Sequence, residues 1–220
     1  MPMKKTSRYI FYLFGMLVAT LVAMAQEAKD EFVLGKHYQA LVPAQPVQTA
    51  GKIEVLEIFW YGCPHCYDFE PFINRWLSTK PSDVEFQRMP AVFRPDWALH
   101  AKAYYTAEAL GVLDKIHTPL FKAIHEDKRK LNDESSLAEF FSEHGVSKEE
   151  FSTSFNSFTV ETKTSQALHM VRQYGIGGVP AIVVNGKYHT SATQAGSYEQ
   201  LLKVTDYLVD KERQGLAKSK

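Results

Sequence analysis

The feature that most constrains this chain is the run Cys63-Pro64-His65-Cys66, which holds both of its cysteines. An apolar run typical of a buried strand precedes it, at residues 52–60, and a helix-like segment follows, at residues 67–77. A Cys-x-x-Cys pair at a strand-to-helix turn is typical of a redox dithiol. The spacing lets the two sulfurs close a small disulfide loop, with the first of them at the helix N-terminus.

The position of Cys63 predicts a reactive thiolate. Unpaired N–H groups at the start of a helix, together with the helix dipole, stabilise an anion there. Pro64 suits the first helical position because its missing N–H leaves no bond unmade, and His65 places an imidazole nearby. Each unit by which the thiol pKa falls below the ambient pH favours the reduced dithiol by about 1.4 kcal/mol. We therefore expect the disulfide form to oxidise other thiols.

Two less specific readings of the cysteine pair stay open on the residues alone. The pair could be half of a structural zinc site, but such sites need four ligands, and the eight histidines form no H-x₃₋₅-H pair that looks like a partner. The pair could also be a structural disulfide, although so short a loop would stabilise the fold little.

The first 25 residues predict a secretory signal peptide. Lys4, Lys5 and Arg8 precede an apolar stretch at residues 9–22, and Ala23-Met24-Ala25 then forms an A-x-A cleavage site. We expect cleavage between Ala25 and Gln26 and export to the periplasm, an oxidising compartment in which disulfides persist. An uncleaved membrane anchor is the alternative, although the apolar stretch is short for a span of about 20 residues.

Charge and length limit the remaining classes of function. The chain has 25 basic and 25 acidic residues, and the predicted signal carries three basic residues and no acidic one, so the mature chain is slightly acidic. It has no basic stripe, so we expect no nucleic-acid partner. A mature length of roughly 195 residues fits one compact domain, or one domain with an insertion.

The order of predicted elements indicates an α/β fold. A first strand is expected at 37–41, and strands at 53–60 and 84–89 flank the helix after Cys63, which predicts a parallel βαβ unit. Strands resume at 181–184 and 187–189, joined by a type I′ turn at Asn185-Gly186. A last helix, capped by Ser197, is predicted through Val209, followed by a frayed tail.

Residues 94–166 show helical signals and no strand signal. A helix of residues 97–110 should stop at Gly111, and a short one should open at Pro119. Capping boxes are predicted at 136–139 and 147–150. The phenylalanines of this region are predicted to be core; they are Phe140, Phe141, Phe151, Phe155 and Phe158.

These features together resemble the DsbA family of periplasmic thiol:disulfide oxidoreductases. The resemblance is carried by the Cys63–Cys66 run with the following Tyr67, by Gly178-Val179-Pro180-Ala181, by residues 184–188, and by shorter matches within 110–121 and 156–158. It implies a thioredoxin-like fold with an inserted all-helical domain. The thioredoxin-like part would comprise residues 26–93 and 167–220, and the insertion residues 94–166.

The resemblance also implies a role for each residue of the motifs. Cys63 would be the exposed nucleophilic sulfur that forms a mixed disulfide, and Cys66 its buried partner. Pro64 and His65 would tune the redox couple. Val179 and Pro180 would form a loop with a cis proline, a form found in about 5–6% of X-Pro bonds, whose backbone pairs with an extended substrate.

Glu57 is a further candidate, because it is a carboxylate within an apolar strand, six residues before Cys63. Burial would raise its pKa, and it could then pass a proton to or from the deeper sulfur. The family has an acidic residue at the matching position and often pairs it with a lysine on the next strand. Arg88 falls there in this chain, and arginine does not give up its proton.

The leading functional hypothesis is an oxidase of newly exported proteins, in which client thiols reduce the Cys63–Cys66 disulfide. A DsbB-like membrane partner would reoxidise the enzyme, which we expect to be a monomer. The dithiol itself serves the reaction, so no dissociable cofactor and no metal are expected. Two alternatives stay open: a reductase or isomerase, and a non-catalytic peptide-binding chaperone. Some family members carry a second disulfide in the insertion, for which this chain has no cysteines.

Overall fold

Strand β2 (Ile53–Phe59) is the centre of the fold, and all seven of its residues are buried. In this computed structural model, β2 pairs in parallel with β3 (Val84–Pro90) and antiparallel with β4 (Ala181–Val184). Its near-continuous apolar sequence follows from this position, because a strand with neighbours on both edges and packed layers on both faces has no solvent side. The predicted parallel βαβ unit is therefore confirmed.

The sheet has five strands in the order β1-β5-β4-β2-β3. β5 (Tyr188–Ser191) pairs antiparallel with β4 across the predicted turn, where Asn185 and Gly186 both have positive φ angles of 50° and 63°. β1 (Gln39–Ala40) pairs with β5 at the edge. The first strand is thus shorter than the predicted residues 37–41, since only two residues find a partner in register.

Two helices pack together on the sheet. α2 (Pro64–Leu77) follows the cysteine motif, and α9 (Tyr198–Lys218) contacts α2, β2, β4 and β5. The indole N–H of Trp76 on α2 donates to Asp206 on α9 over 2.7 Å. This contact joins the helix that carries the cysteines to the C-terminal helix.

The predicted frayed tail after Val209 is wrong, because α9 continues to Lys218. Its last turns are tied to the sheet: Arg213 donates through Nε to Asp83 at 2.7 Å, and the buried Glu212 accepts from Lys187 at 2.7 Å. Contacts across 130 and 25 residues of sequence thus hold the end of a helix whose local composition predicts fraying. The short helix α8 (Ala192–Ala195) was not predicted.

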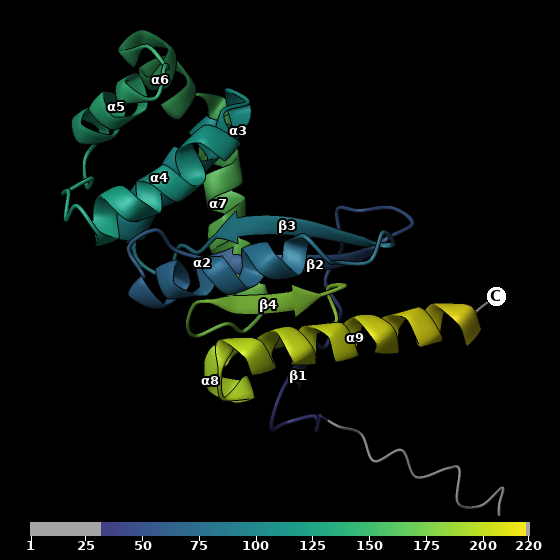
Figure 1. Ribbon diagram of the computed structural model, residues 1–220. Coiled ribbons are helices and arrows are strands. Elements are labelled where there is room, and N and C mark those ends of the chain that lie inside the picture. The colour runs from purple at the N-terminus through teal and green to yellow at the C-terminus, as the bar shows by residue number, and fades with distance from the viewer. Residues whose placement is uncertain (1–31, 219–220) are drawn as a thin grey trace, which may run out of the picture. The chain divides into compact units, whose positions relative to one another are not determined.

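Residues 94–173 form helices, and none of them belongs to a strand. They are η1 (Pro95–Trp97), α3 (Ala98–Ala109), α4 (Leu113–His125), α5 (Glu134–Glu143), α6 (Lys148–Phe155) and α7 (Phe158–Gln173). Figure 1 shows α3 to α6 grouped beyond β3, away from α9. The predicted helical region is confirmed, and α7 runs without a break through its expected end at residue 166.

Three local predictions within this region are wrong. Asp133 is the N-cap of α5, and its carboxylate accepts from the Ser136 N–H. The predicted capping box at Ser136 therefore does not form. α4 begins at Leu113, and Pro119 lies inside it. Phe158 is 86% exposed, although the other four phenylalanines of the stripe are buried. The capping box of Ser147 and Glu150 is confirmed.

The structure describes residues 32–218, and residues from Leu34 onward make up one unit by their contacts. The predicted signal peptide and its cleavage site between Ala25 and Gln26 lie outside the described residues. Within 32–218, no helix has the length and apolar character that a membrane crossing needs.

Candidate active site

The cysteine motif lies where β2 passes into α2. Cys63 is the residue before the first helical turn, with extended backbone angles of −90° and 116°, and Pro64 takes the first helical position. The Cys63 carbonyl accepts from the N–H groups of Cys66 at 3.1 Å and Tyr67 at 3.2 Å. The helix therefore begins as the sequence predicts, with Cys63 at its positive end.

The two sulfurs differ in their surroundings. Both cysteines are free thiols; Cys66 is fully buried and Cys63 is 8% exposed. The expectation of an exposed Cys63 is therefore wrong for the residue as a whole. Cys63 instead lines a surface cavity of about 450 Å³ whose other lining residues are Trp60, Pro64, Phe93, Arg94, Trp97, Gly177, Gly178 and Val179.

Hydrogen bonds and burial give the two thiols different pKa values. The S–H of Cys66 donates to the Cys63 sulfur and is the main reason why the pKa of Cys63 falls to about 6, against the opposing effect of burial. The N–H groups of Cys66 and His65 and the charge of His65 lower this pKa further. Burial, followed by the neighbouring Cys63, raises the pKa of Cys66 well above its ordinary value. At neutral pH the pair therefore consists of one thiolate and one thiol.

Pro64 and His65 are both exposed at the start of α2. His65 Nδ1 lies 3.5 Å from the hydroxyl of Tyr198, the first residue of α9. His65 also lines a cavity of about 770 Å³, together with Val179, Pro180 and residues of α8 and its flanks. The imidazole thus stands between the cysteine pair and this cavity.

The loop before β4 closes over the first sulfur. The Val179–Pro180 peptide bond is cis, as the resemblance implied. The Cys63 sulfur lies 3.5 Å from the Val179 carbonyl oxygen, although 116 residues separate the two in the sequence. The loop therefore places a backbone carbonyl directly beside the reactive sulfur.

Two tryptophan rings lie beside Cys63 in the same cavity. The rings of Trp60 and Trp97 stack with centroids 3.9 Å apart and an interplanar angle of 6°. Gly62 is required for this arrangement, because a Cβ at that position would lie 2.3 Å from the Trp60 ring. The residue immediately before the reactive cysteine is therefore a glycine for a steric reason.

Glu57 is buried at 1% exposure within β2 and pairs with Arg88, its neighbour in the β3 register. Arg88 Nε donates to Glu57 Oε2 over 2.8 Å, while Oε1 finds no hydrogen-bond partner within the described part of the chain. Burial raises the pKa of Glu57 to about 7, even though the Arg88 charge lowers it. The charge of Glu57 in turn raises the pKa of Cys66.

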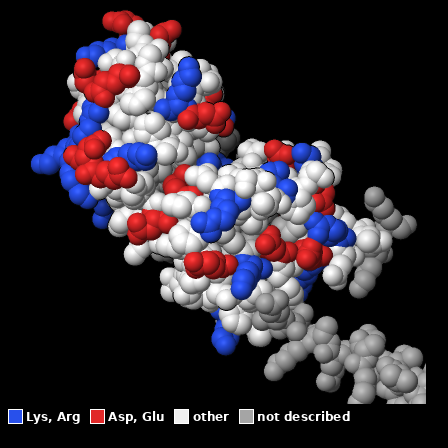
Figure 2. Space-filling model, in the orientation of Figure 1, with Lys and Arg blue, Asp and Glu red and all other residues white. Residues whose placement is uncertain are grey.

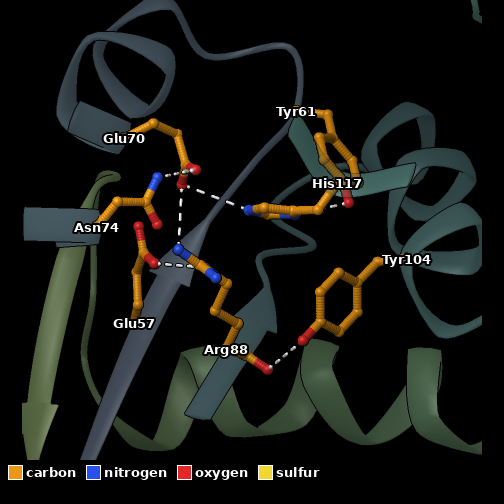
Figure 3. Close-up of polar contacts among 7 residues, drawn as sticks. All are labelled: Glu57, Tyr61, Glu70, Asn74, Arg88, Tyr104 and His117. Atoms are coloured by element: carbon orange, nitrogen blue, oxygen red, sulfur yellow. Dashed lines mark hydrogen bonds and ion pairs between the residues drawn. The ribbon is translucent and has the colours of Figure 1, made fainter. Parts of the chain in front are cut away.

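Sequence reasoning missed four residues of this buried site. Glu70 and Asn74 reach the cluster from α2, His117 from α4, and Tyr61 from the segment after β2 (Figure 3). Glu70 had a signal, since it lies four residues after Cys66 and therefore on the same face of α2. His117 had none, because it lies 60 residues from Glu57 in the sequence and reaches the cluster only through folding.

The described residues do not group three or more His, Cys, Asp or Glu side chains in a way that could hold a metal ion. Cys63 and Cys66 contact each other and the Val179 loop rather than a second ligand pair. The geometry thus gives the zinc reading no support.

Comparisons with known proteins agree with this geometry. Residues 54–204 match the model of the DSBA-like thioredoxin domain. The chain is 43% identical to the thiol:disulfide interchange protein DsbA of Pseudomonas syringae pv. tomato over 199 residues, which cover 90% of this chain and 93% of that protein. The corresponding protein of Burkholderia cepacia is 39% identical over 187 residues, 84% of this chain and 88% of its own.

The fold agrees as well. The crystal structure of Pseudomonas aeruginosa DsbA superposes with a TM-score of 0.82 at 42% identity, covering 86% of this chain and 98% of that one. The thioredoxin-like fold expected from the sequence is thereby confirmed, and so is enzymatic thiol–disulfide exchange through a cysteine pair. This chain belongs to the family of DSBA-like thioredoxin domains and is a thiol:disulfide oxidoreductase.

Proposed function

We propose that the protein donates its Cys63–Cys66 disulfide to newly exported polypeptides. The observation that carries this proposal is the division of acidity between the two sulfurs, with the pKa of Cys63 lowered to about 6 and that of Cys66 raised. A thiol that ionises easily is a good leaving group and stabilises the reduced enzyme, so electrons flow from client thiols to the enzyme.

The proposed reaction begins when a client thiolate attacks the Cys63 sulfur. A bond forms between the client and Cys63, the Cys63–Cys66 bond breaks, and Cys66 leaves with the electron pair and takes up a proton. A second client thiolate then attacks the client sulfur of the mixed disulfide, and Cys63 leaves as a thiolate. The client has lost two electrons and gained a disulfide, and the enzyme has become a dithiol.

Each site residue has a part in this proposal. His65 helps to hold the leaving Cys63 thiolate at a low pKa with its backbone N–H and its charge, and Pro64 occupies the first helical position that places Cys63 at the helix start. Glu57, whose pKa is raised to about 7, gives a proton to Cys66 as it leaves and takes it back on reoxidation. Arg88 stays charged throughout and pairs with Glu57 without relaying the proton.

Val179 and Pro180 are the proposed substrate-binding residues. The Val179 carbonyl lies 3.5 Å from the Cys63 sulfur, and both residues line the 770 Å³ cavity beside the motif. A client strand that pairs with this backbone would bring its own cysteine to Cys63. Binding through the backbone would accept clients of many sequences.

The wider setting is part of the same proposal. The enzyme works in the periplasm as a monomer, with residues 94–166 inserted into the thioredoxin-like part formed by 26–93 and 167–220. A DsbB-like membrane protein reoxidises the dithiol. Clients are polypeptides and not nucleic acids; the face drawn in Figure 2 mixes acidic and basic side chains among its described residues, in keeping with this.

A redox equilibrium with glutathione tests the direction of electron flow. We expect the purified protein to be far more oxidising than thioredoxin, whose potential is about −270 mV. A value near that of thioredoxin would favour the reductase or isomerase alternative.

The Cys63→Ala variant tests the chaperone alternative. It should lose all oxidation of a reduced, unfolded client, while Pro64→Ala, which leaves both sulfurs in place, should retain part of it. Unchanged folding assistance by Cys63→Ala would contradict the proposal, because a non-catalytic chaperone needs no sulfur.

A further inference from the structure

A buried chain of hydrogen bonds leads from Glu57 to helix α4. Arg88 donates to Glu57 Oε2 at 2.8 Å and to Glu70 Oε1 at 3.3 Å. The same Glu70 oxygen lies 3.3 Å from His117 Nε2, and His117 Nδ1 lies 2.9 Å from the Tyr61 hydroxyl. Figure 3 shows these side chains converging from β2, β3, α2 and α4. Arg88 thus donates hydrogen bonds to two buried carboxylates.

The bonds determine which nitrogen of His117 carries the proton. Glu70 as a carboxylate can only accept, so Nε2 must carry the hydrogen and donate it. Burial lowers the pKa of His117 and the ring is therefore neutral at neutral pH, which leaves Nδ1 bare. Tyr61 then donates to Nδ1, and its own pKa is raised by burial, so the hydroxyl keeps its proton. The bonds from Tyr61 through His117 thus point toward Glu70, while Arg88 donates to both Glu70 and Glu57.

The pKa values of Glu57 and Glu70 consequently differ. Burial alone would raise the pKa of Glu70, but the bond from His117, the charge that His117 carries when protonated, the charge of Arg88 and the Asn74 amide outweigh it and lower this pKa. Glu57 accepts from Arg88 only, and its second oxygen has no partner among residues 32–218. With one arginine charge for two carboxylates, the proton that compensates the excess goes to Glu57.

Building on the proposed function, we propose that His117, held in one tautomer by Tyr61, is a positioning residue that keeps Glu70 ionised. It thereby leaves Glu57 as the carboxyl that exchanges a proton with Cys66. His117 touches neither sulfur and acts only through Glu70. The groups that interact with the two carboxylates are Arg88 from β3, Cys66 and Asn74 from α2, His117 from α4, Tyr104 from α3 and Tyr61, and Asp114 of α4 acts on His117.

The test compares His117→Gln with His117→Met, two side chains of similar size of which only the first can donate to Glu70. Carbon-13 NMR of labelled glutamate side chains follows each carboxyl directly, in the oxidised protein and without any client. In the wild type, Glu57 should titrate near 7 and Glu70 below its ordinary range. In His117→Met the Glu70 midpoint should rise and the Glu57 midpoint should fall, whereas His117→Gln should keep the wild-type order.

A kinetic readout accompanies the titration. The rate of mixed-disulfide formation, corrected for the client thiolate fraction, should follow the protonated fraction of Glu57. A fall of one pH unit in the Glu57 midpoint should slow this step about fivefold near pH 7 in His117→Met and leave His117→Gln close to the wild type. If His117→Met fails to fold, Tyr61→Phe replaces it in the test. This change removes the hydrogen bond that holds His117 in one tautomer, and it should shift the pKa values of Glu57 and Glu70 in the same directions.

Three results would overturn the inference. The first is a set of carboxyl midpoints that does not differ among the wild type and the variants. The second is an equal shift of the carboxyl midpoints in His117→Gln and His117→Met. This result would mean that the His117 ring acts through packing and not through its hydrogen bond. The third is titration of Glu70 rather than Glu57 near neutrality in the wild type. A wild-type protein that fails to oxidise thiols would contradict the proposed function instead, and the NMR midpoints would still be readable.

Discussion

At the scale of single residues, reactivity depends on which group bonds to which atom. The sequence predicts a thiolate at Cys63 from the helix N-terminus and the neighbouring His65 imidazole. In the structure the largest contribution comes from the Cys66 thiol, a neighbour three residues along the same turn. The buried member of the pair thus serves as a hydrogen-bond donor before it serves in exchange.

We expect the ultraviolet absorbance of the Cys63 thiolate to titrate with a midpoint near 6 in the reduced protein. Cys66→Ala should raise this midpoint more than His65→Ala does, because the Cys66 S–H bond contributes most. The same titration on both variants decides the order. A larger rise in His65→Ala would show that the imidazole dominates.

Glu57→Gln should change how stability depends on pH. Burial raises the pKa of Glu57 from 4.5 to about 7 in the folded protein, so the folded state holds a proton that the unfolded chain releases in this interval. The free energy of unfolding therefore falls as the pH rises from about 4.5 to 7 and is level above it. The neutral amide should remove this fall and stabilise the protein by roughly 3 kcal/mol near pH 8.

Urea unfolding of both proteins near pH 4 and pH 8 measures this difference. The two should be equally stable at the lower pH, where Glu57 is protonated. Parallel curves for the two proteins across the whole range would mean that Glu57 does not titrate in this interval.

At the scale of the elements, the ends of helices are decided by which polar side chain reaches the free N–H groups. Ser136 and Glu139 have the spacing of a capping box, yet α5 begins three residues earlier at Asp133. A carboxylate accepts from backbone N–H groups at a helix start at least as well as a hydroxyl does. Asp133, the earlier of the two possible capping residues, is therefore the one that caps the helix.

Asp133→Ala should therefore lower the melting temperature by roughly 2–4 °C. Ser136→Ala should lower it less, because it leaves the bond from the Ser136 N–H to Asp133 intact. Thermal unfolding followed by circular dichroism compares the two variants. A greater loss in Ser136→Ala would show that the serine is the cap.

At the scale of the whole molecule, one hydrophobic core joins the sheet to the helical region. The core contains Ile58 and Phe59 of β2 together with Phe121 of α4 and Phe140 of α5. Polar contacts cross the same boundary: His125 of α4 donates to the Tyr61 carbonyl at 2.7 Å, and its ring stacks on Tyr67 of α2. The helices therefore support the segment that leads into Cys63.

The buried charges belong to this scale because β2, β3 and α2 each contribute one. Arg88→Met leaves Glu57 and Glu70 without a counter-charge, and we expect it to cost about 3–5 kcal/mol of stability near pH 7. The cost should shrink as the pH falls, because both carboxyls then take up protons and lose their charge. Arg94→Met, which removes an exposed arginine paired with Asp96, serves as the control and should change stability little.

Urea unfolding from about pH 5 to pH 8 checks this prediction. An Arg88→Met protein whose loss of stability stays the same at every pH would contradict it. The cost would then come from lost packing of the arginine side chain.

The sequence by itself determined the chemistry and the main elements. Two cysteines at a strand-to-helix turn are a local pattern, as are the buried run of β2 and the turn at Asn185 and Gly186, because each depends on neighbours within a few residues. Burial of Glu57 was also predictable, since its strand is apolar on both sides.

Only the tertiary structure decided which distant groups meet. The Val179 carbonyl reaches Cys63 across 116 residues, Arg213 holds α9 to Asp83, and His117 joins Glu70 from another helix. No local pattern encodes these contacts, because each depends on how whole elements pack. The cysteine pair is thus visible in the sequence, while the buried groups around Glu57 and Glu70 meet only through folding.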